Sequence, residues 1–548
     1  MLKKIRVALA VVFWLGITLL FLDFTGALHG WLGWMAKLQF LPAVLAVNIA
    51  VIIGLVLLTL VFGRVYCSVI CPLGVFQDGV AHLNVARKRK KKNRKPYGYS
   101  PEMKWLRYGV WVLFVIALIA GVQALVALLA PYSAWGRIVQ NLFQPVYIWI
   151  NNLFASLAER AGSYTFYDKE VWLRSLPTFI VAVVTLVAMV ILAWKNGRTY
   201  CNTICPVGTT LSFFSRFAMF RPVIDADKCK NCKVCEHNCK AACINIAEHK
   251  IDYSRCVDCF NCLEDCKFGA LKYKYAWGSK KVEEGTSSST HDAGRRAFIA
   301  GAAVAVGTAT LKAQEKKVDG GFATILDKEV PERDVPLTPP GSKSVKDFYR
   351  RYTACQLCVA ECPNNVLRPS TDFKHFMQPE MSYERGYCRP ECTRCSEVCP
   401  AGAIRKITKE EKTQYHVGTA RVNADLCVVE RGVECGNCAR HCPAGAIMLV
   451  KDEETGYRRP VVNEEKCIGC GACENLCPAR PISASPSTDA TTTSTRTSYG
   501  TQRLYQDNGR RGAGPGRSRR GLHPEEEDRT CRRRLRGNGL PGESRERG

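Results

Sequence analysis

Apolar residues are spread unevenly along the chain, and the long apolar runs fall within its first 200 residues. Four runs have the length that a bilayer requires of a spanning helix, about 20 residues. They cover residues 7–28, 41–62, 105–129 and 175–194. The pattern predicts an α-helical membrane bundle of four spans within residues 1–215, followed by polar, soluble parts.

Positive charge marks one side of the predicted bundle. Three basic residues precede the first run, RKRKKKNRK at 87–95 follows the second, and two basic residues follow the fourth. The other two connections carry few or balanced charges. The positive-inside rule therefore puts the N-terminus, the loop at 63–104 and the segment after residue 194 in the cytoplasm.

Two other interpretations of these segments are weaker. A cleavable signal peptide would have a shorter apolar run with a small-residue cleavage site after it, and the first run has neither property. The basic run at 87–95 could suggest nucleic acid. Beside a bilayer it is better explained as an anchor to the anionic cytoplasmic surface, so no nucleic-acid partner is expected.

A twelve-residue motif follows the second and fourth runs. It reads GRVYCSVICPLG at 63–74 and GRTYCNTICPVG at 197–208. The four-residue spacing would put the two thiols of each copy on one helical face, and the proline would start the next segment. A repeat of this kind often builds one shared site between its halves. Cys67, Cys71, Cys201 and Cys205 could there bind a cluster, form redox disulfides, line a quinone site, or be structural buried cysteines.

The chain of 548 residues carries 29 cysteines and a formal charge of +27. All but Cys531 stand in short-spaced groups. A disulfide framework is one explanation of so many cysteines. Crowded C-x-x-C-x-x-C spacing instead folds several thiolates around one centre, which favours metal clusters.

Residues 225–275 hold the C-x2-C-x2-C-x3-C run twice, which is typical of two-cluster bacterial ferredoxins. Zinc usually takes separated C-x-x-C pairs and is disfavoured. Lys240 and Lys267 stand where proline is usual, and the extra Cys243 could replace Cys239 as a ligand. The domain is expected in the cytoplasm. The predicted ligands are Cys229, Cys232, Cys235, Cys239, Cys256, Cys259, Cys262 and Cys266.

A polar linker at 276–293 precedes GRRAFIAGAAVAVGTATLKA at 294–313. The arginine pair before a mildly apolar run resembles a twin-arginine export signal. The segment could export the C-terminal half of the chain, stay as a fifth span, or be a short buried helix.

A second cysteine-rich domain covers residues 345–484, with four groups that each end in C-P and up to four clusters. Tyr352 stands where the first group lacks a fourth cysteine. That centre could be a three-iron cluster, a cluster with a non-cysteine ligand, or absent. The predicted ligands are Cys355, Cys358, Cys362, Cys388, Cys392, Cys395, Cys399, Cys427, Cys435, Cys438, Cys442, Cys467, Cys470, Cys473 and Cys477.

Residues 485–548 differ in composition from the rest of the chain. They contain fourteen arginines, no lysine and no apolar periodicity. Such composition predicts disorder, and the abrupt change resembles an out-of-frame ending.

Two families share these motifs. Residues 1–275 resemble NapH-type membrane ferredoxins, on their four spans, two C-x-x-x-C-P motifs and two cluster runs. Residues 294–484 resemble NapG-type exported ferredoxins, on the twin-arginine pattern and four cysteine groups. The chain thus looks like a fusion: a multi-domain protein with a helical membrane bundle, two ferredoxin-like α+β iron–sulfur domains and a disordered tail.

The resemblance implies an electron-transfer oxidoreductase of quinol dehydrogenase type in the bacterial inner membrane. Electrons would pass from membrane quinol through 4Fe–4S clusters, about two in the first domain and three or four in the second, to a periplasmic reductase. Lipid, quinol and that reductase would be its partners, and quinone a further cofactor. No catalytic acid or base is evident. The rivals are a ferredoxin that assists metal-cofactor assembly and a passive docking scaffold.

Overall fold

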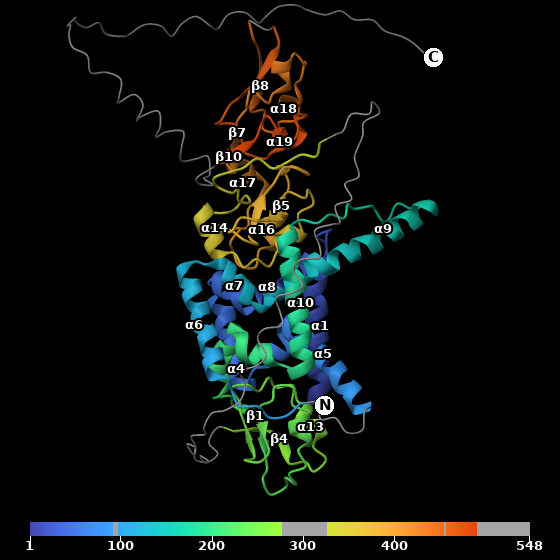
Figure 1. The fold of residues 1–548 in the computed structure, drawn as a ribbon, viewed down its shortest axis with the longest axis vertical. Coiled ribbons are helices and arrows are strands. Elements are labelled where there is room, and N and C mark those ends of the chain that lie inside the picture. The colour runs from blue at the N-terminus through green and yellow to red at the C-terminus, as the bar shows by residue number, and fades with distance from the viewer. Residues whose placement is uncertain (91–96, 277–325, 454–455, 490–548) are drawn as a thin grey trace, which may run out of the picture. The chain divides into compact units, whose positions relative to one another are not determined.

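The computed structural model describes residues 1–90, 97–276, 326–453 and 456–489 (Figure 1). Among the described residues, the elements up to Ser215 are helices, three of which are π-helical turns. The elements are α1 (Leu2–Leu22), α2 (His29–Lys37), α3 (Phe40–Leu45), α4 (Ile49–Phe62), η1 (Tyr66–Ile70), α5 (Pro72–Lys90), α6 (Lys104–Ala120), α7 (Gln123–Leu129), α8 (Pro131–Ile138), η2 (Val139–Phe143), α9 (Gln144–Arg160), α10 (Leu176–Asn196), η3 (Tyr200–Ile204) and α11 (Pro206–Ser215).

Within the described residues, two helices are long and apolar enough to cross a membrane, α1 and α10. They match the first and fourth predicted spans. The other two predicted spans are each divided into two shorter helices, α3 with α4 and α6 with α7. A bundle of four continuous spanning helices is therefore not what the structure contains.

Local backbone chemistry explains both divisions. Asn48 lies inside the second apolar run, where its side-chain oxygen accepts a hydrogen bond from Val51 N at 3.3 Å and caps α4. Gly121 lies inside the third run and ends α6 in the left-handed region, with φ 78°. The mean hydropathy of a run hardly changes when a single residue such as Asn48 or Gly121 ends one helix and begins another.

The first cluster domain follows α11 and contains two small antiparallel sheets. Its elements are β1 (Phe220–Ile224), α12 (Val234–His237), β2 (Ile244–Asn245), β3 (Lys250–Ile251), α13 (Asn261–Asp265) and β4 (Leu271–Tyr275). β1 pairs with β4, so that Phe220 lies opposite Tyr275, and β2 pairs with β3. The pairing of β1 with β4 closes the domain around both cysteine runs.

The second cluster domain contains three two-stranded antiparallel sheets among short helices. β5 pairs with β6, β7 with β10, and β8 with β9. Its elements are α14 (Val345–Arg351), α15 (Leu357–Ala360), β5 (Leu367–Pro369), β6 (Pro379–Met381), α16 (Arg394–Val398), α17 (Lys409–Gln414), β7 (Gly418–Ala420), η4 (Val428–Arg431), α18 (Asn437–Arg440), β8 (Ile447–Lys451), β9 (Arg458–Val462), α19 (Ala472–Leu476) and β10 (Ser487–Asp489).

The boundary of the predicted tail is wrong by five residues. Residues 485–489 belong to the fold, since β10 pairs with β7 and Ser487 is buried. Composition misled because a short edge strand needs backbone hydrogen bonds and no apolar periodicity. The rest of the tail, the twin-arginine-like segment and the linker after residue 276 lie outside the described residues.

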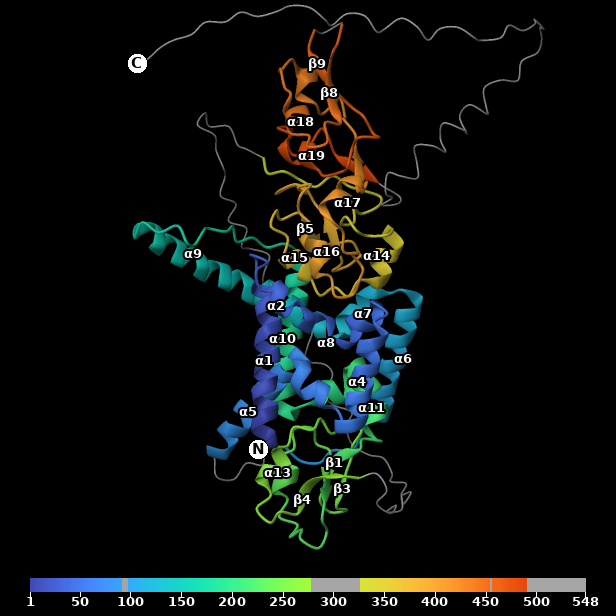
Figure 2. The ribbon, with the colours of Figure 1, turned by 180° about the vertical axis from the view of Figure 1, so that it is seen from behind.

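The two cluster domains contact opposite ends of α1 (Figures 1 and 2). At its N-terminal end Lys3 forms an ion pair with Glu264 of the first domain. Just past its C-terminal end, Phe24 O accepts a hydrogen bond from Arg394 Nη1 of the second domain at 3.4 Å. A helix of 21 residues is about 31 Å long, which is close to the thickness of a bilayer core.

Candidate metal centres

Two apolar cavities in the first cluster domain are lined by the predicted ligands. One cavity has the first three cysteines of the first run together with Cys266, the last of the second run. The other has the first three cysteines of the second run together with Cys239 and Cys243. Each run thus sends its last thiol to the other cavity, as in two-cluster ferredoxins.

The choice between Cys239 and Cys243 stays open. Their Sγ atoms are 3.5 Å apart, both are buried, and both line the same cavity. Either thiol can therefore complete the set of four.

Two cavities of the same kind lie in the second cluster domain. Cys442 lines one with Cys467, Cys470 and Cys473. Cys477 lines the other with Cys427, Cys435 and Cys438. The third and fourth groups therefore exchange their last thiols, a pairing that the sequence left undecided.

The first and second groups exchange thiols in the same way. Burial is the main cause that raises the pKa of the Cys358 thiol, and the negative charge of the Cys355 and Cys399 thiolates raises it further. Burial and the thiols of Cys388 and Cys362 raise the pKa of Cys395. Helix α15, which carries Cys358, packs against α16, which ends just before Cys399. By analogy with the third and fourth groups, Cys399 is assigned to the first group and Cys362 to the second.

The thiols fit the 4Fe–4S clusters that the spacing predicts. A cubane cluster needs four thiolates around an apolar volume. Four of the cavities offer at least four cysteines each in mostly apolar surroundings. Such clusters would supply one-electron carriers, and the chain holds them and sets their surroundings.

The two C-x-x-x-C-P motifs lie side by side in one buried core, and their arginines bond across it. Nη2 of Arg64 lies 3.8 Å from Cys67 Sγ of its own motif and donates to Cys201 O at 3.1 Å. Nη1 of Arg198 lies 3.6 Å from Cys201 Sγ and donates to Cys67 O at 2.7 Å. The sequence repeat is thus an interlocked pair, and each arginine fixes the first cysteine of both motifs.

The final glycine of each motif allows this close approach. A Cβ atom on Gly74 would lie 2.3 Å from Cys67 O and 2.8 Å from Arg198 Nη1. A Cβ atom on Gly208 would lie 2.3 Å from Cys201 O and 2.8 Å from Arg64 Nη2. Any other residue would push apart the carbonyl and the guanidinium that bonds to it.

The first cysteine of each motif lies within a π-helical turn and the second directly follows it, where the sequence suggested an ordinary helical turn. Cys71 N bonds to Tyr66 O at 2.9 Å and Cys205 N bonds to Tyr200 O at 2.9 Å, both five residues back. Pro72 and Pro206 then begin α5 and α11, as the sequence predicted. All four cysteines are buried.

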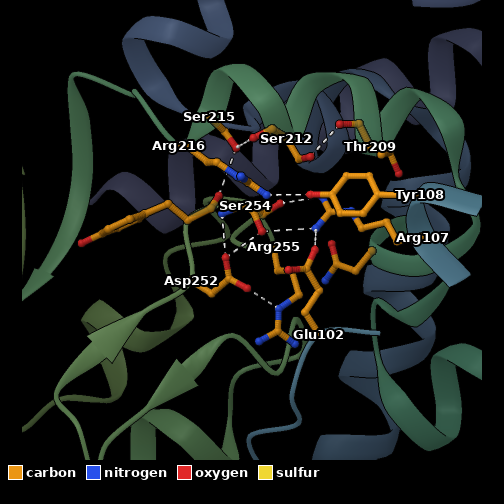
Figure 3. Close-up of polar contacts among 12 residues, drawn as sticks. Glu102, Arg107, Tyr108, Thr209, Ser212, Ser215, Arg216, Asp252, Ser254 and Arg255 are labelled. Atoms are coloured by element: carbon orange, nitrogen blue, oxygen red, sulfur yellow. Dashed lines mark hydrogen bonds and ion pairs between the residues drawn. The ribbon is translucent and has the colours of Figure 1, made fainter. Parts of the chain in front are cut away.

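One carbonyl of the first cluster domain accepts two hydrogen bonds from this helical part. Ser254 O accepts hydrogen bonds from Arg64 Nη1 at 2.9 Å and from Arg107 Nη2 at 3.0 Å. Figure 3 shows Arg107 reaching Ser254 and Glu102, and Ser215 of α11 beside the same loop. Both guanidiniums are fully buried, so the loop before Cys256 is held firmly against the helices.

A buried carboxylate ties α1, α5 and the first cluster domain together. Asp78 of α5 accepts from Arg198 Nε at 2.6 Å, from Lys240 Nζ at 2.9 Å, and from Arg6 of α1. Burial opposes ionisation of Asp78, but these three cations outweigh it and hold the pKa of the carboxyl well below its usual range.

This network explains the lysine that stands in place of proline after Cys239. Besides its ion pair with Asp78, Lys240 accepts the backbone N–H of Arg198 on its carbonyl at 2.7 Å. Lys267, the equivalent residue of the second run, is exposed, and nothing in the structure explains it.

On the other side of the core, α8 packs directly against the first group of the second domain. A Cβ atom on Gly136 would lie 2.4 Å from Cys355 O. Asn141 of η2 donates to Gln356 Oε1 at 3.1 Å. The helical part therefore touches cysteine loops of both cluster domains.

A pocket lies beside this second contact. Its lining residues include Gln140, Asn141, Gln144, Lys169, Trp172 and Arg174. Burial, and to a smaller extent the positive charge of Arg174, lowers the pKa of Lys169 to about 8. The pocket combines amides and cations with apolar walls, which suits a ring that carries hydrogen-bonding oxygens.

The sequence reasoning missed the residues that bind the parts together. Arg64 and Arg198 are inside the quoted motifs and could have been singled out as repeated charges at the end of an apolar run. Asp78, Arg107 and Gln356 carry no signal of their own, because their partners are distant in the sequence.

Two family models match the chain, and both describe cluster binding. The 4Fe-4S binding domain model matches residues 44–94 and 177–223, which contain the two C-x-x-x-C-P motifs. The 4Fe-4S dicluster domain model matches residues 431–480. Together with the cysteine-lined cavities, these matches define a ferredoxin-type 4Fe–4S protein.

Curated relatives agree with that class. The methylamine utilization ferredoxin-type protein MauM of Methylorubrum extorquens is 33% identical over 158 residues, 26% of this chain and 67% of that protein. The chain belongs to this family of ferredoxin-type proteins. The ferredoxin-type protein NapF of Escherichia coli is 29% identical over 175 residues, 31% of this chain and 96% of that protein.

An uncharacterized protein of Methanocaldococcus jannaschii is 27% identical over 231 residues, 42% of this chain and 72% of that protein. No solved structure matches the chain. The class of iron–sulfur electron-transfer protein is thereby supported, while the NapH and NapG types in particular remain a prediction.

Proposed function

We propose that the chain is a membrane-bound quinol dehydrogenase module of the fused NapH and NapG type. It passes electrons from membrane quinol through 4Fe–4S clusters to a periplasmic reductase. The observation that supports this most is the contact of two cluster domains with opposite ends of α1. A helix of that length separates the two faces of a bilayer.

Exposed apolar side chains support the membrane part of the proposal. Ile180, Val184, Val187 and Ile191 lie on one face of α10 and are 48–61% exposed. The opposite face, with Ala182, Met189 and Ala193, is buried. An apolar stripe of this length would be costly in water and suits lipid contact. The divided helices of the second and third predicted spans would complete four crossings. They would pack around the motif core, the buried core that the motifs at 63–74 and 197–208 form.

The motif core lies between the two cluster domains and could carry electrons from one to the other. Arg64 bonds both to the motif cysteines and to the loop before Cys256. On the other side, α8 touches Cys355. The proposal assigns Cys67, Cys71, Cys201 and Cys205 to one redox site between the domains. The cluster-binding description of the model that matches these residues favours a cluster there.

Quinol would bind in the pocket beside Gln140 and Arg174. Its oxidation to quinone releases two electrons and two protons, while each cluster accepts one electron at a time. The pocket lies one hydrogen bond from the first cluster loop, because Asn141 lines it and donates to Gln356. The protons would leave on the side of the second domain.

The test uses the purified full chain in detergent with ubiquinol and menaquinol analogues. Quinol should reduce the clusters at turnover speed, followed by EPR and visible absorption. Cys71→Ser and Cys205→Ser should stop the reduction by quinol of the clusters in the first domain, which lies across the motif cysteines from the pocket, while dithionite still reduces those clusters. Cys531→Ser, outside every motif, is the matched control.

Clusters that stay oxidised with every quinol would contradict the proposal. The alternative, a ferredoxin that assists metal-cofactor assembly of an oxidase or reductase, would then be favoured. Full activity in both cysteine variants would instead leave the motif cysteines with a structural role.

A further inference from the structure

The first cysteine group of the second domain has the register of a complete cluster loop. Tyr352, Cys355, Cys358 and Cys362 have the same spacing as Cys467, Cys470, Cys473 and Cys477 of the fourth group. Tyr352 therefore stands at the position of Cys467, which lines a cavity with three other thiols.

The backbone of the two loops is also alike. Ala354 and Gln356, on either side of Cys355, have φ 52° and 63°. Gly469 and Gly471, on either side of Cys470, have φ 69° and 76°. Non-glycine residues rarely adopt this region, and here two are held in it within three residues. The first group has thus kept the strained conformation of a cluster loop although one cysteine is absent.

Three thiols remain for this site: Cys355, Cys358 and Cys399 of the second group. Cys355 and Cys358 are both buried. Helix α15, which carries Cys358, packs against α16, which ends just before Cys399. Tyr132 belongs to α8, the helix whose Gly136 packs against Cys355 O. Its hydroxyl is buried with no hydrogen-bond partner among the described residues, which leaves it free to donate to a cluster sulfide.

The Tyr352 side chain stands where a four-iron cluster would have its fourth iron, and it does not act as a ligand in place of a thiolate. It is 2% exposed, and its ring stacks on Phe348 with centroids 5.6 Å apart. Its oxygen accepts the backbone N–H of Gln356 at 3.2 Å, inside the loop. A tyrosine oxygen lies five bonds beyond Cβ and a cysteine sulfur only one. Because the Tyr352 backbone stands where a cysteine ligand would stand, its longer side chain reaches into the space of the fourth iron.

We propose that Cys355, Cys358 and Cys399 hold a three-iron 3Fe–4S cluster, and that Tyr352 closes the corner where the fourth iron would sit. The remaining three groups of the domain hold four-iron clusters. This inference concerns the cluster type alone and stands whether or not quinol is the electron donor.

The experiment uses the full chain, purified without oxygen, oxidised with ferricyanide and measured by EPR and Mössbauer spectroscopy. The wild-type chain should give the near-isotropic signal of an oxidised three-iron cluster, integrating to a single cluster per chain. Tyr352→Cys should lose this signal, bind one more iron and gain a four-iron signal after reduction with dithionite. Tyr352→Phe should keep it, because the phenol oxygen is not a ligand.

Two controls assign the signal to this site. Tyr349→Cys adds a thiol one helical turn away on α14 and should keep the three-iron signal. Cys358→Ser removes a ligand and should abolish it. Visible absorption of the other clusters reports whether each variant is folded.

Three results would overturn the proposal. One is a wild-type chain with only four-iron clusters. Another is a three-iron signal that persists in Cys358→Ser, since the signal would then come from damage elsewhere. The last is a signal that appears only in Tyr352→Phe, because Tyr352 would then be a ligand of a fourth iron.

Discussion

At the scale of residues, the twelve-letter repeat is explained almost position by position. The arginine reaches its own motif's first cysteine and the other motif's carbonyl, and the final glycine leaves room for that bond. The tyrosine anchors the turn: Tyr66 Oη donates to Gln39 Oε1 at 3.1 Å, and Tyr200 Oη donates to Leu129 O at 2.9 Å. The repeat therefore encodes an interface between two halves of the chain as much as a set of ligands.

The close approach that Gly74 allows can be tested with a matched pair of substitutions on α5. Gly74→Ala places a methyl group 2.3 Å from a backbone carbonyl that has little freedom to move. It should lower the free energy of unfolding by about 1–3 kcal/mol. Gly79→Ala, on the same helix with open space around it, should raise that free energy by about 0.5–1 kcal/mol. Thermal unfolding in detergent measures both, and equal effects would show that the close approach is not what Gly74 serves.

At the scale of elements, much could be predicted from the sequence and some could not. The presence of α1 and α10 follows from long apolar runs, although α1 covers Leu2–Leu22 where the run predicted residues 7–28. The cluster loops follow from cysteine spacing. The division of α3 from α4 depends on Asn48, and that of α6 from α7 on Gly121, which are single residues inside uniform apolar runs. The exchange of last thiols between groups depends on contacts across the fold and cannot be deduced from spacing.

Helix α5 gives the prediction at this scale, since Asp78 joins it to three partners. Asp78→Asn would leave Arg6, Arg198 and Lys240 buried without their counter-charge. The free energy of unfolding should fall by about 3–5 kcal/mol. Glu264→Gln breaks only the exposed pair with Lys3, so it should leave the unfolding temperature nearly unchanged. Similar stabilities for the two variants would contradict a structural role of the buried network.

At the scale of the whole chain, the proposal requires the second cluster domain to lie outside the cytoplasm. A reporter should be fused after residue 489, because residues 485–489 form part of the fold. Alkaline phosphatase fused there should be active and green fluorescent protein dark, and the same reporters fused after residue 90 should behave oppositely. A fluorescent fusion after residue 489 would exclude export. Replacing Arg295 and Arg296 by lysine should abolish the phosphatase activity.

Lys240 has one more consequence, which concerns the order in which the protein matures. It follows directly after Cys239, a predicted cluster ligand, and its ammonium and carbonyl both bond to the helical part. Metal binding that orders the Cys239 loop therefore also orders the surface on which Arg198 and Asp78 dock. The free energy of cluster binding is shared between the two parts by linkage. Iron supply should therefore affect how stably the helices pack, and loss of a cluster in the first domain should weaken the helical part that Lys240 joins to it.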